Sequence, residues 1–354
     1  MQLTKYKLGD LIVQRREKNK NFDVPIRGVS KEGFIKPKQQ EADTSIYNVF
    51  YRNDFVFNPA RMELNSIALN LEFDKALCSS LYEVFYVKDE SIVLPEYLNL
   101  HIKREEFARY CDYIGLGSAR EYCRFANISG YEIYLPSIDK QQEIVEADRL
   151  IKRRIHLNEQ LIHSLEATAQ ALYRKMFVDN IDKENLPAGW RMGTIGDMFE
   201  LQRGFDLPSQ ERKDGEFPIY ASTGIAEYHN QYKVDAPCVV TGRSGTIGEV
   251  FYVDEKCWPL NTTLWVKDFK DTPSFFVYYK LKELELGKTV SGFAAVPTLN
   301  RNDVHMMESI IPPIDILIEF DNEMKVIHHH KTITEQENLK LTELQSLLLA
   351  KMGQ

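Results

Sequence analysis

Residues 242–248 have the sequence GRSGTIG, whose residue types could bind nucleic acid. An arginine guanidinium can donate two hydrogen bonds to a guanine edge, and hydroxyl groups donate to phosphate oxygens. Arg243, Ser244 and Thr246 are therefore candidates for DNA contact. The glycines recur at every third position, which is not the G-x-G-x-x-G spacing of dinucleotide-binding loops. The same stretch is equally compatible with a tight turn between strands, because glycine readily adopts positive φ.

Three other stretches come close to catalytic or metal-binding motifs without completing them. Residues 287–289 are GKT, but a P-loop needs a glycine where Lys282 stands. Residues 57–60 are FNPA, close to the Asn-Pro-Pro-aromatic tetrad of adenine methyltransferases, yet alanine replaces the second proline and Arg61 replaces the aromatic residue. Residues 328–330 are histidines, and adjacent helical residues face different sides, which favours a solvated or partner-facing surface over a metal site. We therefore expect no catalytic residue and no metal, which favours a binding protein.

Basic residues gather at the start of a chain that is acidic overall. The net charge is −8, whereas residues 1–40 hold ten basic and four acidic residues. A local basic surface is what meets phosphate, so this balance is compatible with DNA binding. Charge alone favours a solvated face to the same degree.

The elements that would position these residues are arranged around an internal repeat. Residues 136–177 and 312–352 match without a gap at a shift of 176 positions, and both begin with Pro-x-Ile-Asp. Neither segment contains glycine or proline after this entry, and both are rich in helix-favouring residues. The sequence therefore predicts two long helices, each preceded by a module of its own.

Apolar residues recur every seven positions in both predicted helices, and the middle position of each series is polar. The predicted seam consists of Ile144, Ile151, Asn158, Leu165 and Leu172 in the first helix and Phe320, Ile327, Thr334, Leu341 and Leu348 in the second. A polar residue within an apolar seam fixes register and partner in coiled coils. The other interpretation is an amphipathic helix packed on a globular core, but the length favours a coiled coil.

The two modules follow the same plan. Residues 46–51, 55–57 and 80–87 are predicted to form strands, residues 94–110 a helix, and Gly9-Asp10 has a counterpart in Gly196-Asp197. The predicted domains are a first module at 1–135, a helix at 136–178, a linker at 179–188, a second module at 189–311 and a helix at 312–354. If the helices pair antiparallel, a pseudo-twofold axis relates the modules and both chain ends lie near the first module.

Composition indicates an ordinary globular protein, with 44% hydrophobic and 27% charged residues. The five cysteines form no Cys-x-x-Cys pair, which favours reduced thiols over a disulfide framework or a zinc site. No signal-peptide pattern and no membrane-spanning stretch is found, so we expect a cytoplasmic protein.

In this order the motifs resemble the specificity subunit of type I restriction–modification enzymes. The likeness extends over the whole chain. It rests on the two Pro-x-Ile-Asp helix entries, the first followed by QQEIV at 141–145. It rests also on residues 242–248 with NTTLWV at 261–266 downstream, and on PTLNRNDV at 297–304. The second helix departs from the pattern, because Ile316-Leu317-Ile318 stands where the first has Lys140-Gln141-Gln142.

The resemblance implies an α+β protein with two α/β target-recognition domains, related by a pseudo-twofold and separated by an antiparallel coiled coil of two long helices. It implies a non-catalytic subunit that reads an interrupted, bipartite DNA sequence. It implies two modification subunits, which bind S-adenosylmethionine and methylate adenine, and two restriction subunits, which use ATP and Mg²⁺. No cofactor is expected in this chain, and no membrane contact.

The predicted DNA contacts follow from this interpretation. They are Arg15, Arg16, Lys18, Lys20 and Arg61 in the first module, and Arg243, Ser244, Thr246 and Arg301 in the second. Two alternatives remain at this point: a stand-alone DNA-modifying enzyme, and a protein-only coiled-coil scaffold.

Overall fold

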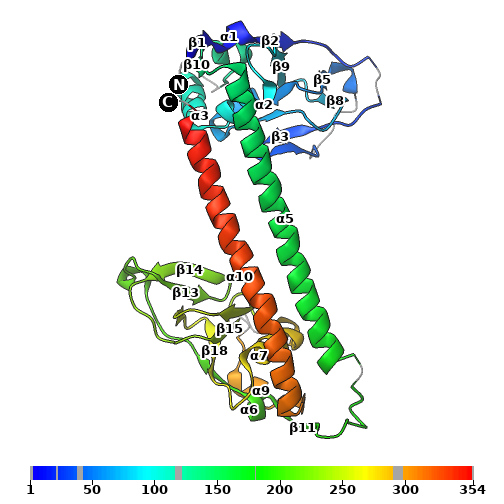
Figure 1. Cartoon of the computed structure of the whole chain (residues 1–354), viewed down its shortest axis with the longest axis vertical. Helices are drawn as coiled ribbons and strands as arrows, with labels where there is room; N and C mark the ends of the chain where they lie inside the picture. Colours follow the sequence, from blue (N-terminus) through cyan, green and yellow to red (C-terminus); the bar gives the residue numbers. More distant parts are fainter. Residues whose placement is uncertain are drawn as a thin grey trace. The chain divides into compact units, whose positions relative to one another are not determined.

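The structure, a computed structural model, describes residues 3–20, 23–37, 43–115, 122–179, 181–289 and 298–352. The chain forms two compact units (Figure 1). The first unit is Met1–Leu157 with Glu337–Gln354, and the second is Asn158–Gln336. The segments at 115–120 and 291–296, which also correspond under the 176-residue shift, lie almost entirely outside the described residues.

The first module is built mainly from short strands. Its elements are β1 (Thr4–Lys7), α1 (Leu8–Leu11), β2 (Ile12–Arg15), β3 (Gly28–Ser30), β4 (Gly33–Ile35), the 3-10 helix η1 (Thr44–Ile46), β5 (Asn48–Tyr51), β6 (Phe55–Phe57), η2 (Pro59–Leu64), β7 (Ile67–Leu69), β8 (Lys75–Cys78), β9 (Glu83–Val87), α2 (Pro95–Ile102), α3 (Glu105–Gly115), α4 (Phe125–Ile128) and β10 (Glu132–Leu135). Its largest sheet has the strand order β2-β9-β6-β7.

The second module repeats this plan. Its elements are β11 (Arg191–Thr194), α6 (Ile195–Met198), β12 (Glu200–Arg203), η3 (Ser209–Glu211), β13 (Phe217–Ala221), β14 (Gly224–His229), β15 (Cys238–Gly242), β16 (Val250–Val253), β17 (Trp258–Pro259), β18 (Thr263–Asp268), α7 (Ser274–Glu283), α8 (Leu286–Thr289), α9 (Arg301–His305) and β19 (Glu308–Ile311). Its largest sheet has the order β12-β18-β15-β16, which matches the first sheet strand for strand.

The repeat extends to individual hydrogen bonds. Strands β1 and β10 pair antiparallel in the first module, as β11 and β19 do in the second. The Leu8 amide donates to the carbonyl of Tyr131 at 2.8 Å, and the Ile195 amide donates to the carbonyl of Met307 at 3.0 Å. Tyr131 and Met307 are separated by the same 176 positions that relate the long helices.

A glycine is required at the same point of both modules. A Cβ on Gly9 would lie 2.9 Å from the Cβ of Ser129, and one on Gly196 would lie 3.1 Å from the carbonyl oxygen of His305. The segment before β10 or β19 therefore packs directly against the backbone of the short helix. This explains why both modules have a glycine at this point.

The two long helices are α5 (Ile138–Phe177) and α10 (Ile314–Lys351). In the first unit, Ile144 and Val145 near the start of α5 share a core with Leu348, Leu349 and Met352 at the end of α10. The chain therefore returns to the first module at its C-terminal end, as predicted.

In the second unit the order of the helix ends is reversed. Tyr173 and Phe177 near the end of α5 pack with Phe320 near the start of α10, at ring-centroid distances of 5.8 and 5.1 Å. The helices therefore run antiparallel within each unit. Ion pairs join them, with Arg154 to Glu337 at 3.0 Å in the first unit and Lys331 to Glu166 at 2.5 Å in the second.

The ten residues predicted for the seam are all buried or half-buried. Asn158 and Thr334, the polar members, are among the buried ones. The Thr334 hydroxyl donates to the carbonyl of His330 at 2.7 Å, one turn earlier. The seam therefore keeps its polar position inside.

The first turns of α5 and α10 differ in sequence because they pack against different surroundings. Gln141 is fully buried and holds the segment before α2, because its side chain accepts from the Leu94 amide at 3.0 Å and donates to the carbonyl of Ile92 at 2.9 Å. Leu317, at the matching position of α10, is instead buried in the apolar core of the second unit. One entry is fixed by hydrogen bonds and the other by apolar contact.

Two predicted elements of the first module differ in their bounds. The strand expected at 80–87 begins at Glu83, because residues 79–82 form a turn. The helix expected at 94–110 is two helices, α2 and α3, which break at Lys103. The Lys103 ammonium reaches the carbonyls of Ile67 at 2.6 Å and Lys31 at 2.9 Å, and burial lowers its pKa to about 8.

Candidate nucleic-acid interface

The second module contains a cleft of about 480 Å³ that three arginines line. Its walls come from three separate elements. Arg203 is the last residue of β12, Arg243 follows β15 directly, and Arg301 is the first residue of α9. Arg301 is held in place because the Asn300 side chain caps α9, accepting a hydrogen bond from the Asn302 amide at 3.0 Å.

The loop that carries Arg243 is fixed by its backbone. The Arg243 amide donates to the carbonyl of Thr262 at 2.9 Å, and its own carbonyl accepts from the Leu299 amide at 2.8 Å. A Cβ on Gly242 would lie 1.9 Å from the carbonyl oxygen of Thr246, so glycine is needed there. The GRSGTIG stretch is therefore a tight turn, as one of the two interpretations predicted, and its Arg243 lines a cleft.

The side chains that line this cleft carry positive charge, and two of its arginines can still bind a ligand. Arg243 and Arg301 make no side-chain hydrogen bond or ion pair with any residue that the structure describes, and the one acidic group near Arg203 is Asp206 at 3.9 Å. Ser244 is half-buried and pairs through a backbone bridge with Thr298, and Thr246 is exposed. These two predicted residues lie beside the cleft without lining it.

The first module contains a larger cleft, of about 940 Å³. Three arginines line it too: Arg27, Arg61 and Arg124. Tyr47, Tyr82 and Tyr122 add aromatic surface, and Ile35, Pro37 and Leu81 add apolar surface. Arg61 is exposed and has no side-chain partner among the described residues.

The two clefts occupy the same place in the repeated plan. The Cys123 amide donates to the carbonyl of Pro59 at 2.9 Å, as the Leu299 amide does to that of Arg243. Cys123 and Leu299 are separated by 176 positions, and both precede the short helix that borders the cleft. Each cleft therefore lies between the loop after one central strand, β6 or β15, and the start of α4 or α9.

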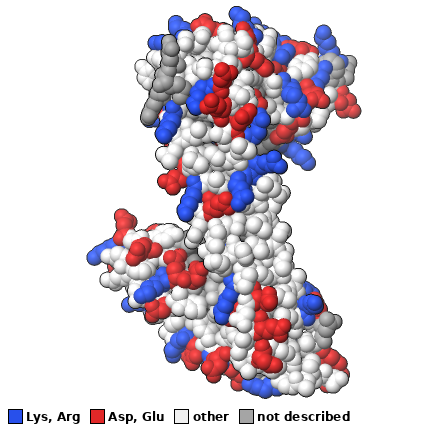
Figure 2. Space-filling model, in the orientation of Figure 1, with Lys and Arg blue, Asp and Glu red and all other residues white. Residues whose placement is uncertain are grey.

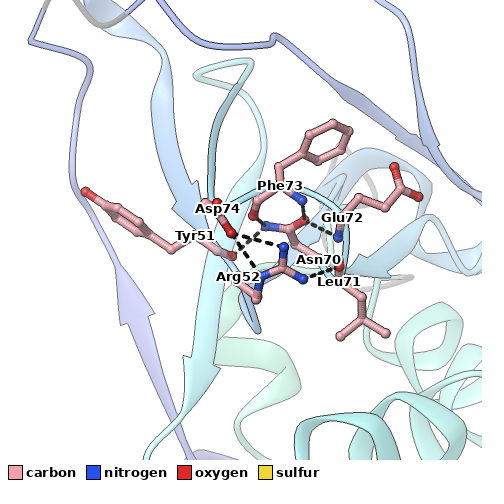
Figure 3. Close-up of polar contacts among 7 residues, drawn as sticks. All are labelled: Tyr51, Arg52, Asn70, Leu71, Glu72, Phe73 and Asp74. Carbon is pink, nitrogen blue, oxygen red and sulfur yellow. Dashed lines mark hydrogen bonds and ion pairs between the residues drawn. The ribbon is translucent and has the colours of Figure 1, made fainter.

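Polar contacts hold the turn between β7 and β8 (Figure 3), and Arg27 packs on this turn. Asn70 is fully buried and its amide donates to the carbonyls of Tyr51 and Phe73, each at 2.7 Å, while its oxygen accepts from the Phe73 amide at 2.9 Å. The Arg27 guanidinium lies over the Phe73 ring, 4.7 Å from its centroid. The turn therefore supports a wall of the cleft.

Arg124 is oriented by a carboxylate and a ring. Its guanidinium lies 3.6 Å from Glu83 and 5.4 Å from the centroid of Tyr122. Glu83 also accepts from the Phe125 amide at 2.7 Å, so it holds the start of α4 as well. The net charge of the first cleft is positive, because Glu83 is the one acidic residue beside three arginines in its lining.

Four of the basic residues predicted in the first module lie outside the lining of this cleft. Arg15 binds Asp54, with Nε 2.6 Å and Nη2 3.0 Å from the two carboxylate oxygens. Arg16 donates to the Gln14 side chain at 2.9 Å, and Lys18 to the carbonyl of Ile46 at 2.9 Å; Lys20 is exposed.

Arg27, Arg124 and Arg203 line the clefts but were not among the predicted contacts. The sequence held a signal for Arg124, whereas Arg203 is related to a predicted contact through the observed strands. Arg124 is separated by 176 positions from Asn300, which adjoins the predicted contact Arg301. Arg203 ends β12, whose counterpart β2 ends at the predicted contact Arg15.

His328 is half-buried, whereas the other two residues of the histidine run, His329 and His330, are exposed. Its Nε2 lies 3.0 Å from a carboxylate oxygen of Asp254, and its ring contacts Tyr252 at a centroid distance of 5.1 Å. This hydrogen bond lowers the pKa of Asp254. Within the described ranges there is no group of three or more His, Cys, Asp or Glu side chains that could hold a metal ion.

Surface charge is mixed outside the clefts. Figure 2 shows basic and acidic side chains interspersed on the visible face of each unit. Among the helices that the structure describes, none has the length and apolar composition to cross a bilayer.

Comparisons with known proteins agree on one family. The sequence model of the type I restriction modification DNA specificity domain matches residues 4–167 and 187–343. The chain is 23% identical over 301 residues to the MjaIX specificity subunit of Methanocaldococcus jannaschii, covering 73% of this chain and 68% of that protein. It is 21% identical over 358 residues to the HindI specificity subunit of Haemophilus influenzae, covering 74% and 77%.

Solved structures show the same fold. The S subunit of a type I restriction–modification system from M. genitalium superposes with a TM-score of 0.67 at 14% identity, over 100% of this chain and 96% of that one. A chain from a study of complex assembly and conformational transition in the type I R-M system gives 0.54 at 16% identity, over 99% and 97%. The predicted α+β fold with a duplicated domain and two long helices is confirmed.

Proposed function

The chain belongs to the type I restriction–modification specificity subunits, which recognise DNA sequence, and we propose that each of its modules reads one half of an interrupted target. One observation supports this proposal above all others. The repeat places an arginine-lined cleft at the same point of both modules, and the backbone bonds that build the two clefts match. Two equivalent reading surfaces in one chain suit a target made of two half-sites.

In the second cleft, we assign different contacts to the three arginines. Arg243 is half-buried and its backbone is fixed on both sides, so its side chain can be aimed at one base edge. Arg203 and Arg301 are exposed at the rim and would contact phosphates. In the first cleft, the unpaired Arg61 would approach the bases, and Arg27 and Arg124 would contact the backbone.

The long helices supply surfaces for partner subunits. In the first unit the exposed apolar residues on α5 and α10 are Leu150, Leu157, Leu339, Leu344 and Leu347, and in the second unit they are Leu161, Ile314, Ile318, Val326 and Ile333. Apolar side chains repeated along the outside of a helix mark an interaction surface. Two modification subunits would dock here, and two restriction subunits would join the complex. S-adenosylmethionine, ATP and Mg²⁺ would then bind the partners, with no cofactor in this chain.

The helices would also set the gap between the half-sites. They connect the two modules in the chain, and their antiparallel pairing within each unit is fixed by apolar contacts and ion pairs. A spacer of regular helix has a defined length per residue, so the gap in the target would be constant.

Methylome sequencing of the host, with and without this gene, tests the proposal. We expect an interrupted adenine-methylated motif that disappears when the subunit is absent and that changes in one half when Arg243 is replaced by alanine. A methylation pattern that does not depend on this chain contradicts the proposal. Methyl transfer by the isolated chain with S-adenosylmethionine would instead establish a stand-alone enzyme.

A further inference from the structure

The first cleft presents an exposed leucine at its mouth. Leu81 is 77% exposed, and it lines the cleft together with Ile35, which is 42% exposed, and Tyr122, which is 37% exposed. A single exposed leucine on a protein surface is ordinary. It is unusual, however, to find three exposed apolar side chains in the lining of a cleft that also carries Arg27, Arg61 and Arg124.

The turn that carries Leu81 is rigid. The Tyr82 amide donates to the carbonyl of Ser79 at 3.0 Å, and the Leu81 amide donates to the Ser79 hydroxyl at 3.3 Å. From outside the turn, the Asn48 side chain donates to the carbonyl of Tyr82 at 2.7 Å and to that of Ser79 at 3.4 Å. The backbone is therefore fixed before any ligand binds, and little conformational entropy would be lost on contact.

The chemistry around Leu81 fits one feature of duplex DNA. Cations attract phosphates, but an apolar side chain that must stay in contact with a nucleic acid needs an apolar group on a base. The 5-methyl group of thymine is the apolar group that the major groove exposes. We propose that Leu81 contacts a thymine methyl group in the half-site read by the first module; this inference rests on the proposed function.

In the described part of the second module, no exposed leucine stands at the corresponding turn. This turn, between β17 and β18, is shorter, and the Thr263 amide donates to the carbonyl of Leu260 at 2.9 Å. Asn261 stands within this turn and its side chain bonds to Asp206. Reading of a thymine methyl group is therefore confined to one half-site, which supplies an internal control.

The test measures how tightly the complex of this chain with its modification subunits binds a DNA duplex. The duplex contains the target motif identified by methylome sequencing. Each thymine of one half-site at a time is replaced by deoxyuridine, which keeps the base pair and removes only the methyl group. We expect affinity to fall by about fourfold at one thymine of a single half-site, the effect of losing one buried methyl group. Leu81→Ala should bind the normal target about fourfold more weakly or worse, and should no longer distinguish thymine from uracil.

Ile92→Ala is the control, because Ile92 is 38% exposed in the same module but does not line the cleft. It should keep wild-type affinity and the wild-type response to uracil. Equal binding of thymine and uracil by the wild-type complex overturns the proposal, as does a Leu81→Ala variant that still distinguishes them. A target without a T·A pair in either half-site overturns it too.

A different set of results would mean that the proposed function itself is wrong. In that case the complex would not prefer its target over random duplex, whatever stands at residue 81.

If Leu81→Ala weakens binding while uracil has no effect, the leucine acts as a wedge between base pairs, and the thymine contact is refuted.

Discussion

Replacing Arg15 by alanine removes the cation that faces a buried carboxylate. Asp54 has a side chain that is only 2% exposed, against 25% for Arg15. Two hydrogen bonds from Arg15 and one from the Tyr51 amide, at 2.8 Å, satisfy the Asp54 oxygens. The guanidinium also lies 4.8 Å from the centroid of the Tyr51 ring and 4.6 Å from that of Tyr86.

The expected loss of stability is large for a single arginine. Breaking a buried ion pair by removing one partner costs about 3–5 kcal/mol, because the other charge stays buried. This cost is smaller here because Arg15 is partly exposed and the hydrogen bond from the Tyr51 amide to Asp54 remains. The lost contacts of the guanidinium with the two rings add about 0.5–1 kcal/mol each. We therefore expect Arg15→Ala to destabilise the first unit by about 3 kcal/mol at pH 7.

The loss should depend on pH in a definite direction. Burial raises the pKa of Asp54 despite the arginine, and the pKa should rise further without it. A carboxyl whose folded-state pKa is raised binds its proton more tightly in the folded state, so its cost is present at high pH and disappears at low pH. The difference between variant and wild type should therefore shrink as pH falls from 7 toward the raised pKa.

Urea unfolding followed by two probes measures this. The three tryptophans, Trp190, Trp258 and Trp265, all lie in the second unit, so their fluorescence reports that unit alone, whereas circular dichroism reports both. Arg15→Ala should shift the circular-dichroism transition without moving the fluorescence transition. Arg16→Ala is the control at an exposed residue, and it should change the free energy of unfolding from either probe by no more than about 0.5 kcal/mol. Adding Asp54→Asn should remove the pH dependence. A variant as stable as wild type at pH 7, or a loss that is constant with pH, would refute this reasoning.

Four further predictions concern recognition and its support. Arg243→Ala should reduce discrimination at one base pair of the second half-site by about 1–3 kcal/mol in competition binding, without changing the salt dependence. Arg301→Gln should instead weaken all sequences alike and reduce the slope of log affinity against log salt by about one, and a reversal of these two results would contradict the assignment. Asn70→Asp keeps the two hydrogen bonds that Asn70 accepts, but it removes the amide group that donates to the carbonyls of Tyr51 and Phe73. It should therefore destabilise the first unit by about 2–3 kcal/mol in circular-dichroism melts. Glu72→Gln is the control and should leave the stability unchanged. Deleting one heptad from both long helices should change the gap between half-sites or abolish methylation, and an unchanged gap would show that the helices do not set it.

The long helices and the duplication could be predicted from the sequence because their signals are local or periodic. A heptad pattern and a proline before each helix need no knowledge of distant residues, and a fixed shift of 176 positions shows the repeat directly. The bounds that were wrong depend on distant contacts. Asn48 holds the turn at 79–82 that shortens a strand, and Lys103 reaches the carbonyls of Ile67 and Lys31 where a helix was expected to continue.

The clefts could be predicted only in part for the same reason. Arg243 and Arg61 follow central strands, so a local pattern indicated them. Arg27 and Arg124 come to the same cleft from positions almost a hundred residues apart, and no local pattern brings them together. Arg15 shows a contact that no local pattern could predict. Its charge suggested DNA contact, but the structure places a buried carboxylate beside it, which the sequence did not show.

The two clefts also show how one scaffold can carry different recognition residues. The Asn58 amide donates to the carbonyl of Ser66 and the Gly242 amide to that of Glu249, each at 3.0 Å, so both loops are closed in the same way. In each module a backbone hydrogen bond also ties the loop to the segment before the short helix. Because backbone groups make these bonds, they place few demands on the side chains, and the loops differ at nearly every position. A module built in this way can change the bases it reads by substitution in the cleft, without losing the bonds that form it.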